Sequence, residues 1–461
     1  MMRCSIPDLP EDIWRHIHSL LPLRDAARAA CLSRALLHSW RCHPNLTLSR
    51  DMLIGSKAHA CDGNFSDIID RILRNHSGCL KVLKLDLDGI SCRYLDSWLA
   101  IAVTPGIEEL ILIPFRCKYS LPCSFLSDGV RNSIRYLELG FCTFRPTAEL
   151  GHLRSLTSLH LRTVRIRGDE LECVLSNSLA LEQLVLIDCK EIVCLNIPEL
   201  QQLSYLKVFG CRRLRVIESK APNLSSFFLT GNIPKVSLGE TLQMKNLTLY
   251  RSNVVCYARA ELSCTMPNLE TLVLRSGEEV VNTPMLPSKF LYLKHLSIHL
   301  TSGLSFSPSY DYFSLVSFLD ASPSLETLIL DVSQDRMEHE SVFGDSSHFR
   351  QMTEHRHRCL KSVKISGFSS AKSLVELTCY ILNNAVSLEC LSLNTVYGFR
   401  CSDKGCKGCH PISQGILEEA PRAAMAIRAY IEDKVPSTVK LTVLGPCSEC
   451  HGRPDGLHNK V

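Results

Sequence analysis

The stretch Leu181-Glu-Gln-Leu184-Val-Leu186 decides the fold of this chain, because versions of it return along most of the sequence. Alternation of the L-x-L kind predicts a short strand with one buried face. A single unit cannot cover its own apolar face, so neighbouring units must stack side by side. The sequence therefore predicts a solenoid of parallel strands.

The spacing of the units identifies the kind of solenoid. They begin at residues 80, 107, 134, 156, 181, 203, 224, 247, 269, 293 and 325. A period of 20–29 residues with an L-x-x-L-x-L core is the signature of a leucine-rich repeat, an α/β fold. Cys142, Cys189 and Cys211 occupy the position after the strand where this repeat takes Asn or Cys. We expect a structural role for them in the turn.

The side chains between the leucines are predicted to line an exposed concave face. Solenoids of this kind bind partners along that surface. Any single residue there could equally be a solvated strand residue, so the prediction concerns the surface as a whole. Its candidate target-binding residues are Ser158, His160, Arg162, Gln183, Val185, Tyr205, Lys207 and Phe209.

Three short helices are predicted ahead of the repeats, within residues 6–50. Pro10 suits the first position of a helix. Ile13, Ile17 and Leu20 then fall on one apolar face. Three such helices hold too little core to be stable alone, so the segment should lean on a partner or on the next domain.

This N-terminal segment resembles the plant F-box. The match runs through Leu9-Pro-Glu-Asp-Ile13, Leu20-Leu-Pro-Leu23, Cys31-Leu-Ser-Arg34 and Ser39-Trp-Arg41. The resemblance implies that the helices bind the Skp-type adaptor of a cullin-based (SCF) ubiquitin ligase. The implied adaptor-binding residues are Leu9, Pro10, Ile13, Ile17, Leu20, Leu21, Pro22, Leu23 and Trp40. Many plant members carry Arg-Trp after Leu-Ser, whereas this chain has Arg34-Ala-Leu36, which removes an aromatic anchor.

The remaining chain divides by pattern. Residues 51–79 are predicted to form a linker and a helix, near 65–73, that caps the solenoid; the repeats occupy 80–332. Residues 333–358 are polar, and we expect a surface loop whose histidines are solvated and not metal ligands. Residues 359–396 predict strand–helix–strand and resemble the FBD region of many plant (grass-type) F-box/leucine-rich-repeat proteins. A Cys-rich tail, 397–461, should hold a helix near 416–432 and a strand near 439–444.

Two C-x-x-C-H stretches in that tail, 406–410 and 447–451, allow three interpretations. Covalent haem uses this spelling but needs an export or organellar address, which the N-terminal sequence does not suggest. Zinc could be held by the four thiolates of Cys406, Cys409, Cys447 and Cys450. The third interpretation is plain structural or surface thiols, the default in reducing compartments. No other cofactor is expected.

Composition and motifs restrict the function. The 461 residues are 45% apolar and 21% charged with a net charge of +4, which gives no reason to expect nucleic acid or a membrane as partner. No apolar run reaches the length of a membrane span, and we expect a nuclear or cytoplasmic protein. The sequence shows no phosphate-binding glycine loop, G-x-S-x-G or H-E-x-x-H.

These features together predict a substrate-recognition subunit of a ubiquitin ligase with no catalytic site of its own. Its expected partners are the Skp-type adaptor, through it a cullin, and a protein target. One alternative is a leucine-rich-repeat scaffold with a degenerate F-box. Another is a zinc-dependent nucleic-acid binder, against which the weak charge and the lack of basic, aromatic-interleaved stretches argue.

Overall fold

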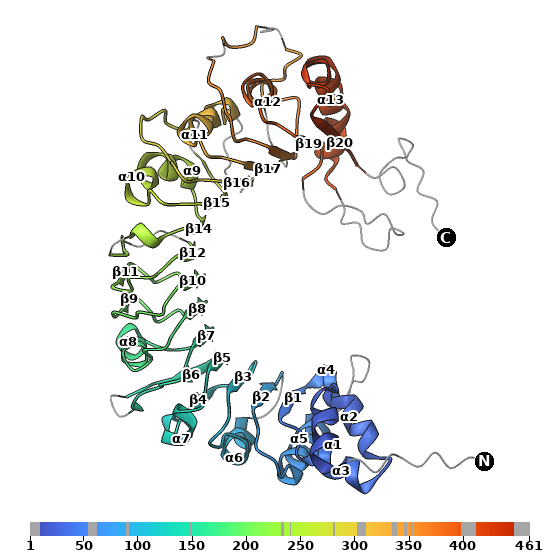
Figure 1. Ribbon diagram of the computed structural model, residues 1–461, viewed down its shortest axis with the longest axis vertical. Helices are drawn as coiled ribbons and strands as arrows, with labels where there is room; N and C mark the ends of the chain where they lie inside the picture. Colours follow the sequence, from blue (N-terminus) through green and yellow to red (C-terminus); the bar gives the residue numbers. More distant parts are fainter. Residues whose placement is uncertain are drawn as a thin grey trace, which may run out of the picture. The chain divides into compact units, whose positions relative to one another are not determined.

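The chain forms two compact units, residues 1–224 with 233–240, and residues 225–232 with 241–461. In each unit a parallel sheet carries helices along one side and leaves its other side, called here the open face, uncovered (Figure 1). This computed structural model describes residues 10–53, 62–88, 92–147, 150–231, 235–239, 241–279, 282–301, 310–333, 339–344, 348–351, 354–397 and 412–446.

The first unit begins with the three predicted helices. They are α1 (Glu11–Ser19), α2 (Leu23–Ala30) and α3 (Arg34–Arg41). Pro10 and Pro22 immediately precede α1 and α2, where a missing N–H costs nothing. The Ser33 side chain accepts a hydrogen bond from the Leu36 N–H and caps α3.

The main sheet of this unit runs in chain order and is parallel throughout. Its strands are β1 (Asn45–Ser49), β2 (Val82–Asp86), β3 (Glu109–Ile113), β5 (Tyr136–Gly140), β7 (Ser158–Arg162), β8 (Gln183–Ile187) and β10 (Tyr205–Phe209). Leu46 aligns with Leu83, and Leu83 with Leu110, so each leucine stacks on the next. The sheet thus starts at β1, ahead of the first repeat that the sequence predicted at residue 80.

Helices and short strands connect these strands on the covered side of the sheet. The helices are α4 (Arg50–Leu53), α5 (Asp62–Asn75), η1 (Cys92–Tyr94), α6 (Leu95–Ala102), η2 (Cys123–Phe125), α7 (Asp128–Arg131) and α8 (Gly168–Ser176). The short strands are β4 (Tyr119–Leu121) paired with β6 (Cys142–Phe144), and β9 (Cys194–Ile197), β11 (Val216–Ser219) and β13 (Lys235–Ser237). The α5 helix confirms the one predicted near residues 65–73.

A left-handed residue turns the chain at the end of several strands. Phe141, Thr163, Asp188 and Gly210 have φ angles of 52°, 54°, 52° and 67°. Each follows the strand by one residue, so the same backbone turn recurs from repeat to repeat. This conformation costs a non-glycine residue roughly 1–2 kcal/mol, which the stacking of the buried leucines must offset.

The second unit repeats the design. Its main strands are β12 (Ser226–Thr230), β14 (Asn246–Tyr250), β15 (Thr271–Ser276), β16 (His295–Leu300), β17 (Thr327–Val332), β18 (Ser362–Ser366), β19 (Cys390–Asn394) and β20 (Lys440–Leu444). Its helices are η4 (Thr241–Gln243), α9 (Val254–Tyr257), η5 (Ala258–Leu262), α10 (Ser263–Thr265), η6 (Tyr312–Leu315), α11 (Val316–Ala321), α12 (Lys372–Asn384), α13 (Gln414–Tyr430) and η7 (Glu432–Lys434). The predicted strand–helix–strand is β18, α12 and β19, and it continues the same sheet.

The core of both units is made by the leucines of the repeat. Leu110, Leu184, Leu272 and Leu391 are all 0% exposed. Burying one such side chain contributes roughly 1.5–3 kcal/mol, so the stacked rows supply the main driving force for folding. Within the described residues, no helix is long and apolar enough to cross a membrane.

The described part of the predicted polar loop packs onto α12. The Arg350 guanidinium pairs with Asp311 at 2.6 Å and with the fully buried Glu376 at 3.2 Å. The Arg350 N–H also donates to Glu376, and Val342 is 4% exposed. Arg350 thus compensates a carboxylate that would otherwise be costly to bury.

Candidate functional site

The first candidate site is an apolar surface on α1. Ile13, Ile17 and Leu20 are 41%, 36% and 72% exposed, although all three are large and apolar. Their spacing places all three on one face of the helix, which is left exposed while α1 packs on the rest of the helical domain. Exposed apolar patches of this kind mark interaction sites.

The other residues predicted to bind the adaptor are placed unequally. Pro10 and Pro22 are exposed, and Leu21 and Trp40 are half-buried. Leu23 is 6% exposed and belongs to the core of the helical domain, so its side chain is not on the surface. Leu9 lies outside the described residues.

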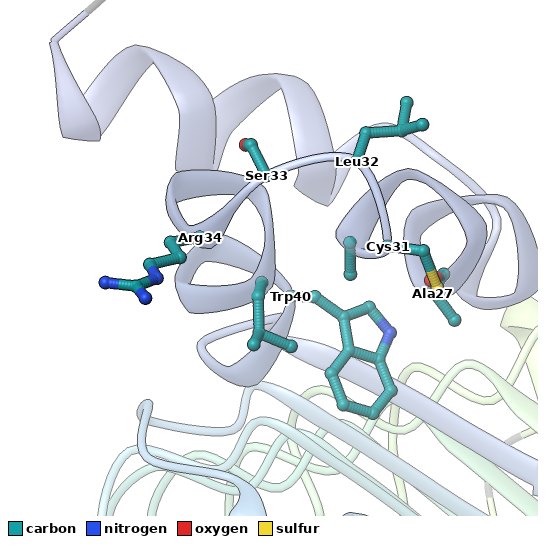
Figure 2. Close-up of a pocket in the computed structure, with 8 residues that line it drawn as sticks. Ala27, Cys31, Leu32, Ser33, Arg34 and Trp40 are labelled. Carbon is teal, nitrogen blue, oxygen red and sulfur yellow. The ribbon is translucent and has the colours of Figure 1, made fainter.

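A hollow of about 540 Å³ lies between α2 and α3 in the same helical domain. Figure 2 shows Trp40 and Cys31 facing the hollow, whereas Arg34 extends away from it. Its lining residues are Ala27, Ala30, Cys31, Leu32, Ser33, Arg34, Leu37 and Trp40. The Trp40 Nε1–H is buried and has no hydrogen-bond partner in the described part of the chain.

The sequence analysis did not assign Leu32 and Leu37 to this surface. They are 72% and 37% exposed, whereas Leu36 is 5% exposed and fills the core. The available signal was their position off the face that carries Leu36. Ala35, where many plant members carry tryptophan, is exposed.

The second candidate site is the open face of the first unit, where the sequence predicted target contacts. Arg162, Gln183 and Phe209 are exposed there, whereas Val185 is 7% exposed. The predicted residues that remain, Ser158, His160, Tyr205 and Lys207, are half-buried. The structure thus brings all eight onto adjacent strands, β7, β8 and β10.

His160 is fixed on this face by its neighbour on β5. The Tyr136 hydroxyl lies 2.9 Å from His160 Nδ1, and the two rings pack edge to face with centroids 4.9 Å apart. The same hydroxyl donates to Glu138 at 2.8 Å. Burial lowers the pKa of His160, with Lys207 and Arg162 acting in the same direction and Glu138 against it. The imidazole is therefore a neutral, oriented group.

The open face of the second unit carries a polar groove of about 450 Å³, called here the second-unit groove. Its lining residues are Tyr250, Arg275, His299, Thr301, Asp331, Lys364, Ser366 and Tyr397. Five of them, Tyr250, Arg275, His299, Asp331 and Ser366, follow one another in register across β14 to β18. Sequence analysis missed this row, although aligning the residue after each L-x-L would have revealed it.

Asp331 is the centre of a hydrogen-bonded set in this groove. Its carboxylate lies 2.9 Å from His299 Nδ1, and Ser297 Oγ lies 3.0 Å from His299 Nε2. Burial alone would raise the pKa of the Asp331 carboxyl, but hydrogen bonds from His299 and Ser366 and the charge of Lys364 hold it below its ordinary value. Asp331 is thus a compensated anion.

Ser297, His299 and Asp331 have the order of contacts found in acyl-transfer triads. Such chemistry also needs N–H donors aimed at a developing oxyanion. Here β16 pairs with β15 on one side and with β17 on the other, so its backbone N–H groups serve the sheet. The contacts therefore orient His299 and favour the ionised form of Asp331, and they do not by themselves form a hydrolytic site.

The histidines of the predicted polar loop meet an acid. The ligand atoms of Asp320, His355 and His357 lie within 4.8 Å of one another, a set that could hold a divalent ion. In the structure the Tyr380 hydroxyl donates to Asp320 at 2.6 Å and lies 3.2 Å from His357 Nε2. Tyr380 thus already hydrogen-bonds two of the three groups in this set.

The cysteines fall into separate environments. Cys142, Cys189 and Cys211 are buried at the turns after the strands, where the repeat pattern placed them, and burial raises the pKa of Cys142 to about 12. Such thiols act as small apolar groups. The candidate zinc ligands Cys406, Cys409, Cys447 and Cys450 lie outside the described residues.

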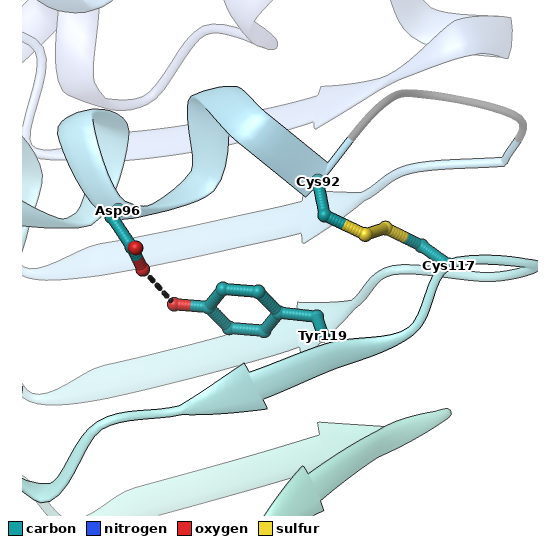
Figure 3. The surroundings of a disulfide bond; sticks show 4 residues. All are labelled: Cys92, Asp96, Cys117 and Tyr119. Carbon is teal, nitrogen blue, oxygen red and sulfur yellow. Dashed lines mark hydrogen bonds between the residues drawn. A yellow bond between two sulfur atoms is a disulfide. The ribbon is translucent and has the colours of Figure 1, made fainter.

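One pair of cysteines is bonded, although free thiols were the expectation. Cys92 and Cys117, with Cα atoms 6.1 Å apart, form a disulfide that links η1 to the segment before β4. Figure 3 shows it beside the 2.8 Å hydrogen bond from the Tyr119 hydroxyl to Asp96. Both links join the α6 region to β4.

Comparison with known proteins adds two family matches. A leucine-rich-repeat domain model, At1g61320/AtMIF1, matches residues 72–448, and the F-box domain model matches residues 6–47. The first match covers most of the chain, and the second covers the three N-terminal helices.

Individual relatives come from Arabidopsis thaliana. The putative FBD-associated F-box protein At1g61330 is 24% identical over 418 residues, which cover 84% of this chain and 90% of that protein. The F-box/FBD/LRR-repeat protein At1g13570 is 24% identical over 421 residues, 87% of this chain and 92% of that protein. The FBD-associated F-box protein At1g61320 is 25% identical over 356 residues, with 71% and 75% covered.

Proposed function

The chain belongs to the family of plant F-box proteins with an At1g61320/AtMIF1-type leucine-rich-repeat domain and an FBD region, and from this premise we propose that it is a substrate-recognition subunit of an SCF-type ubiquitin ligase. The F-box would dock on the Skp-type adaptor and through it on a cullin. The open faces of the repeat units would hold a protein target.

The observation that carries this proposal is that the helical domain exposes an apolar surface on α1 and an apolar-lined hollow between α2 and α3. Ile13, Ile17 and Leu20 expose large side chains, and the Trp40 N–H lacks a partner within the described residues. Interfaces concentrate their binding energy in such apolar and aromatic anchors. A bound adaptor would remove this surface from water and could accept the hydrogen bond of Trp40.

The mechanism is proximity. A receptor that holds both the ligase and the target raises the effective concentration of the target's lysines near charged ubiquitin. Orientation then replaces a bimolecular encounter with one that resembles an intramolecular step. The bond chemistry belongs to other subunits of the ligase. This chain therefore needs only two binding surfaces, one for the adaptor and one for the target, each held in shape by the fold beneath it.

The test is capture of purified Skp-type adaptor by the full chain, with Leu20→Asp as the variant. A charge at this exposed position should weaken capture at least about tenfold, roughly 1.4 kcal/mol. Leu179→Asp is the matched control, because Leu179 is 64% exposed in the same unit but outside the F-box, and it should leave capture unchanged. Equal capture by all three proteins would contradict the proposed docking surface.

The second candidate function is a leucine-rich-repeat scaffold whose F-box no longer binds the adaptor. The exposed Ala35 favours it, because an aromatic anchor is missing from the adaptor-facing domain. Failure of the unmodified chain to capture the adaptor would support the scaffold. Restoration of capture by Ala35→Trp would then trace the failure to this position.

A further inference from the structure

We propose that the second-unit groove binds an extended acidic segment of the protein target, with one carboxylate at Arg275 and a second carboxylate at Lys364. The inference rests on the proposed function, since it names the chemistry of the target that the receptor would hold. It places this contact on the second unit, whereas the sequence pointed to β7, β8 and β10 of the first.

The charges of the groove favour an anion. Arg275 and Lys364 are both exposed, and neither forms an ion pair within the described part of the chain. The one acid in the lining, Asp331, is hydrogen-bonded to His299 and Ser366 and is also stabilised by the charge of Lys364. Arg275 and Lys364 have no direct ion-pair partner within the described residues, so both can face a ligand while Asp331 keeps its two hydrogen bonds.

The distance between the cations favours two acidic groups over one. Arg275 is on β15 and Lys364 on β18, three strand spacings apart. Lys364 aligns through Ile329 and Ser297 with Val273, two residues before Arg275. At about 4.8 Å per spacing and about 3.3 Å per residue along a strand, their backbones are roughly 16 Å apart, a separation that long Arg and Lys side chains can shorten. An extended peptide rises about 3.3 Å per residue and places alternate side chains on one side, so acids at positions i and i+4 lie about 13 Å apart.

Asp331 and His299 set a condition for the residue between those acids. They lie on β17 and β16, between the two cations, so the side chain at i+2 would face them. A carboxylate there would be repelled by Asp331, whereas a hydroxyl or amide could donate to it. The preferred segment is therefore Glu-x-Ser-x-Glu and not a continuous acidic run.

The aromatic residues of the groove suit a peptide. Tyr250, 44% exposed, and the half-buried Tyr397 supply aromatic surface with polar tips, and Tyr397 lies near the charges of Asp331 and Arg275. A volume of about 450 Å³ accommodates several side chains. The internal carboxylate of Asp331 makes the groove a poor match for the uniform negative charge of nucleic acid.

The experiment uses fluorescence anisotropy with the full chain and short labelled peptides of extended, proline-free sequence. The Glu-x-Ser-x-Glu peptide should bind at least tenfold more tightly than its Gln-x-Ser-x-Gln analogue and several-fold more tightly than Glu-x-Glu-x-Glu. Arg275→Gln and Lys364→Gln should each weaken binding several-fold. Lys190→Gln, which removes an exposed charge from the first unit, should have no effect.

Three results would overturn the inference. One is equal binding of the acidic and the glutamine peptides. The second is competition by inorganic phosphate at the same concentration as the peptide, which would make the groove a small-anion site. The third is normal peptide binding by the Arg275→Gln protein. Adaptor capture is measured on the same samples. Arg275→Gln protein that captures adaptor but binds peptide normally sinks only this inference, whereas peptide binding without adaptor capture sinks only the ligase proposal.

Discussion

The two units build the same strand end from different residues. The residues directly after the second apolar position of L-x-L are called here the end row; in the first unit they are Ser49, Asp86, Ile113, Gly140, Arg162, Ile187 and Phe209. In the second unit they are Thr230, Tyr250, Arg275, His299, Asp331, Ser366, Asn394 and Leu444. The backbone register is the same, so the side chains alone place isoleucine and phenylalanine in the first row and line a polar groove in the second.

This difference separates what holds a repeat from what it offers a partner. The leucines beneath both rows are buried to the same degree, for example Leu186 and Leu330 at 0% exposed. The end rows face away from that core and contribute little to it. They are therefore free to differ, and in the second unit they gather charge and hydrogen-bonding groups.

The largest effect is expected from Gly367→Ala, directly after the end row of the second unit. Gly367 has a φ of 73°, and a Cβ there would collide with the Val332 carbonyl, which is backbone and cannot move aside. The left-handed strain of 1–2 kcal/mol and an overpacking cost of typically 1–3 should together lower the free energy of unfolding by roughly 2–5 kcal/mol. Urea denaturation would measure it.

The control for this change is Gly210→Ala in the first unit. Gly210 has a similar φ of 67°, but its added Cβ would meet the carboxylate tip of Asp188, a side chain that can rotate. Only the strain of about 1–2 kcal/mol should remain. Equal losses of unfolding free energy in the two variants would contradict the difference between the crowded Gly367 site and the adaptable Gly210 site.

Asp331→Asn should cost less, about 1–2 kcal/mol, because it removes a charged acceptor from His299 and Ser366. Asp86→Asn is the control, since Asp86 holds the same repeat position in the first unit and its side chain has no hydrogen-bond partner in the described residues. This control substitution should leave the free energy of unfolding nearly unchanged.

The pKa of Asp331 is lowered by folding, so its contribution to stability is present above about pH 4 and is lost as pH falls through the lowered pKa.

In the first unit, His160 should make the stability of the fold depend on pH. Burial holds the pKa of His160 below its ordinary 6.5, so the unfolded chain binds more protons than the folded chain between the two values. Stability is therefore full above about pH 6.5 and falls as the pH drops through that window. His160→Gln should flatten this slope in thermal melts from pH 7.5 to 5.5, and an NMR midpoint for His160 above 6.5 would contradict the explanation.

The architecture followed from the sequence because its signals are local and repeated. L-x-L alternation fixes a strand and its buried face, and stacking then has few solutions. The main strands β2, β3, β5, β7, β8, β10, β12 and β14 to β20 were therefore predicted, whereas the short strands β4, β6, β9, β11 and β13 were not. β1 was not, because Asn45–Ser49 is a single short copy next to the helices. The apolar face of α1 was visible for the same reason of period.

The row of end residues is visible in the sequence, but the groove that this row forms with Lys364 and Tyr397 is not. His299, Asp331 and Lys364 lie far apart in the chain and meet only because three strands align, so their chemistry depends on register and not on local pattern. Asp320 of α11 and His357, in the segment before β18, meet at Tyr380 of α12 by the same kind of tertiary placement. The repeat pattern in the sequence identifies the end-row residues, and the register between strands then shows which of them lie together in a site.

The smallest effect is expected at the start of the strands, the end opposite to the end row, where exposed glutamates pair with lysines of neighbouring repeats. Glu270 accepts from Lys245 and Lys294 at 3.2 Å each, whereas Glu108 in the first unit pairs with Lys81 alone, at 2.6 Å. All these groups are substantially exposed, so each pair contributes little. Glu270→Gln should lower the melting temperature slightly more than Glu108→Gln, because it leaves two lysines without an anion between them. Both shifts should vanish at about 1 M salt, where screening reaches roughly 3 Å. A change in melting temperature that persists at high salt would mean that these glutamate and lysine side chains stabilise the repeats by packing and not by charge.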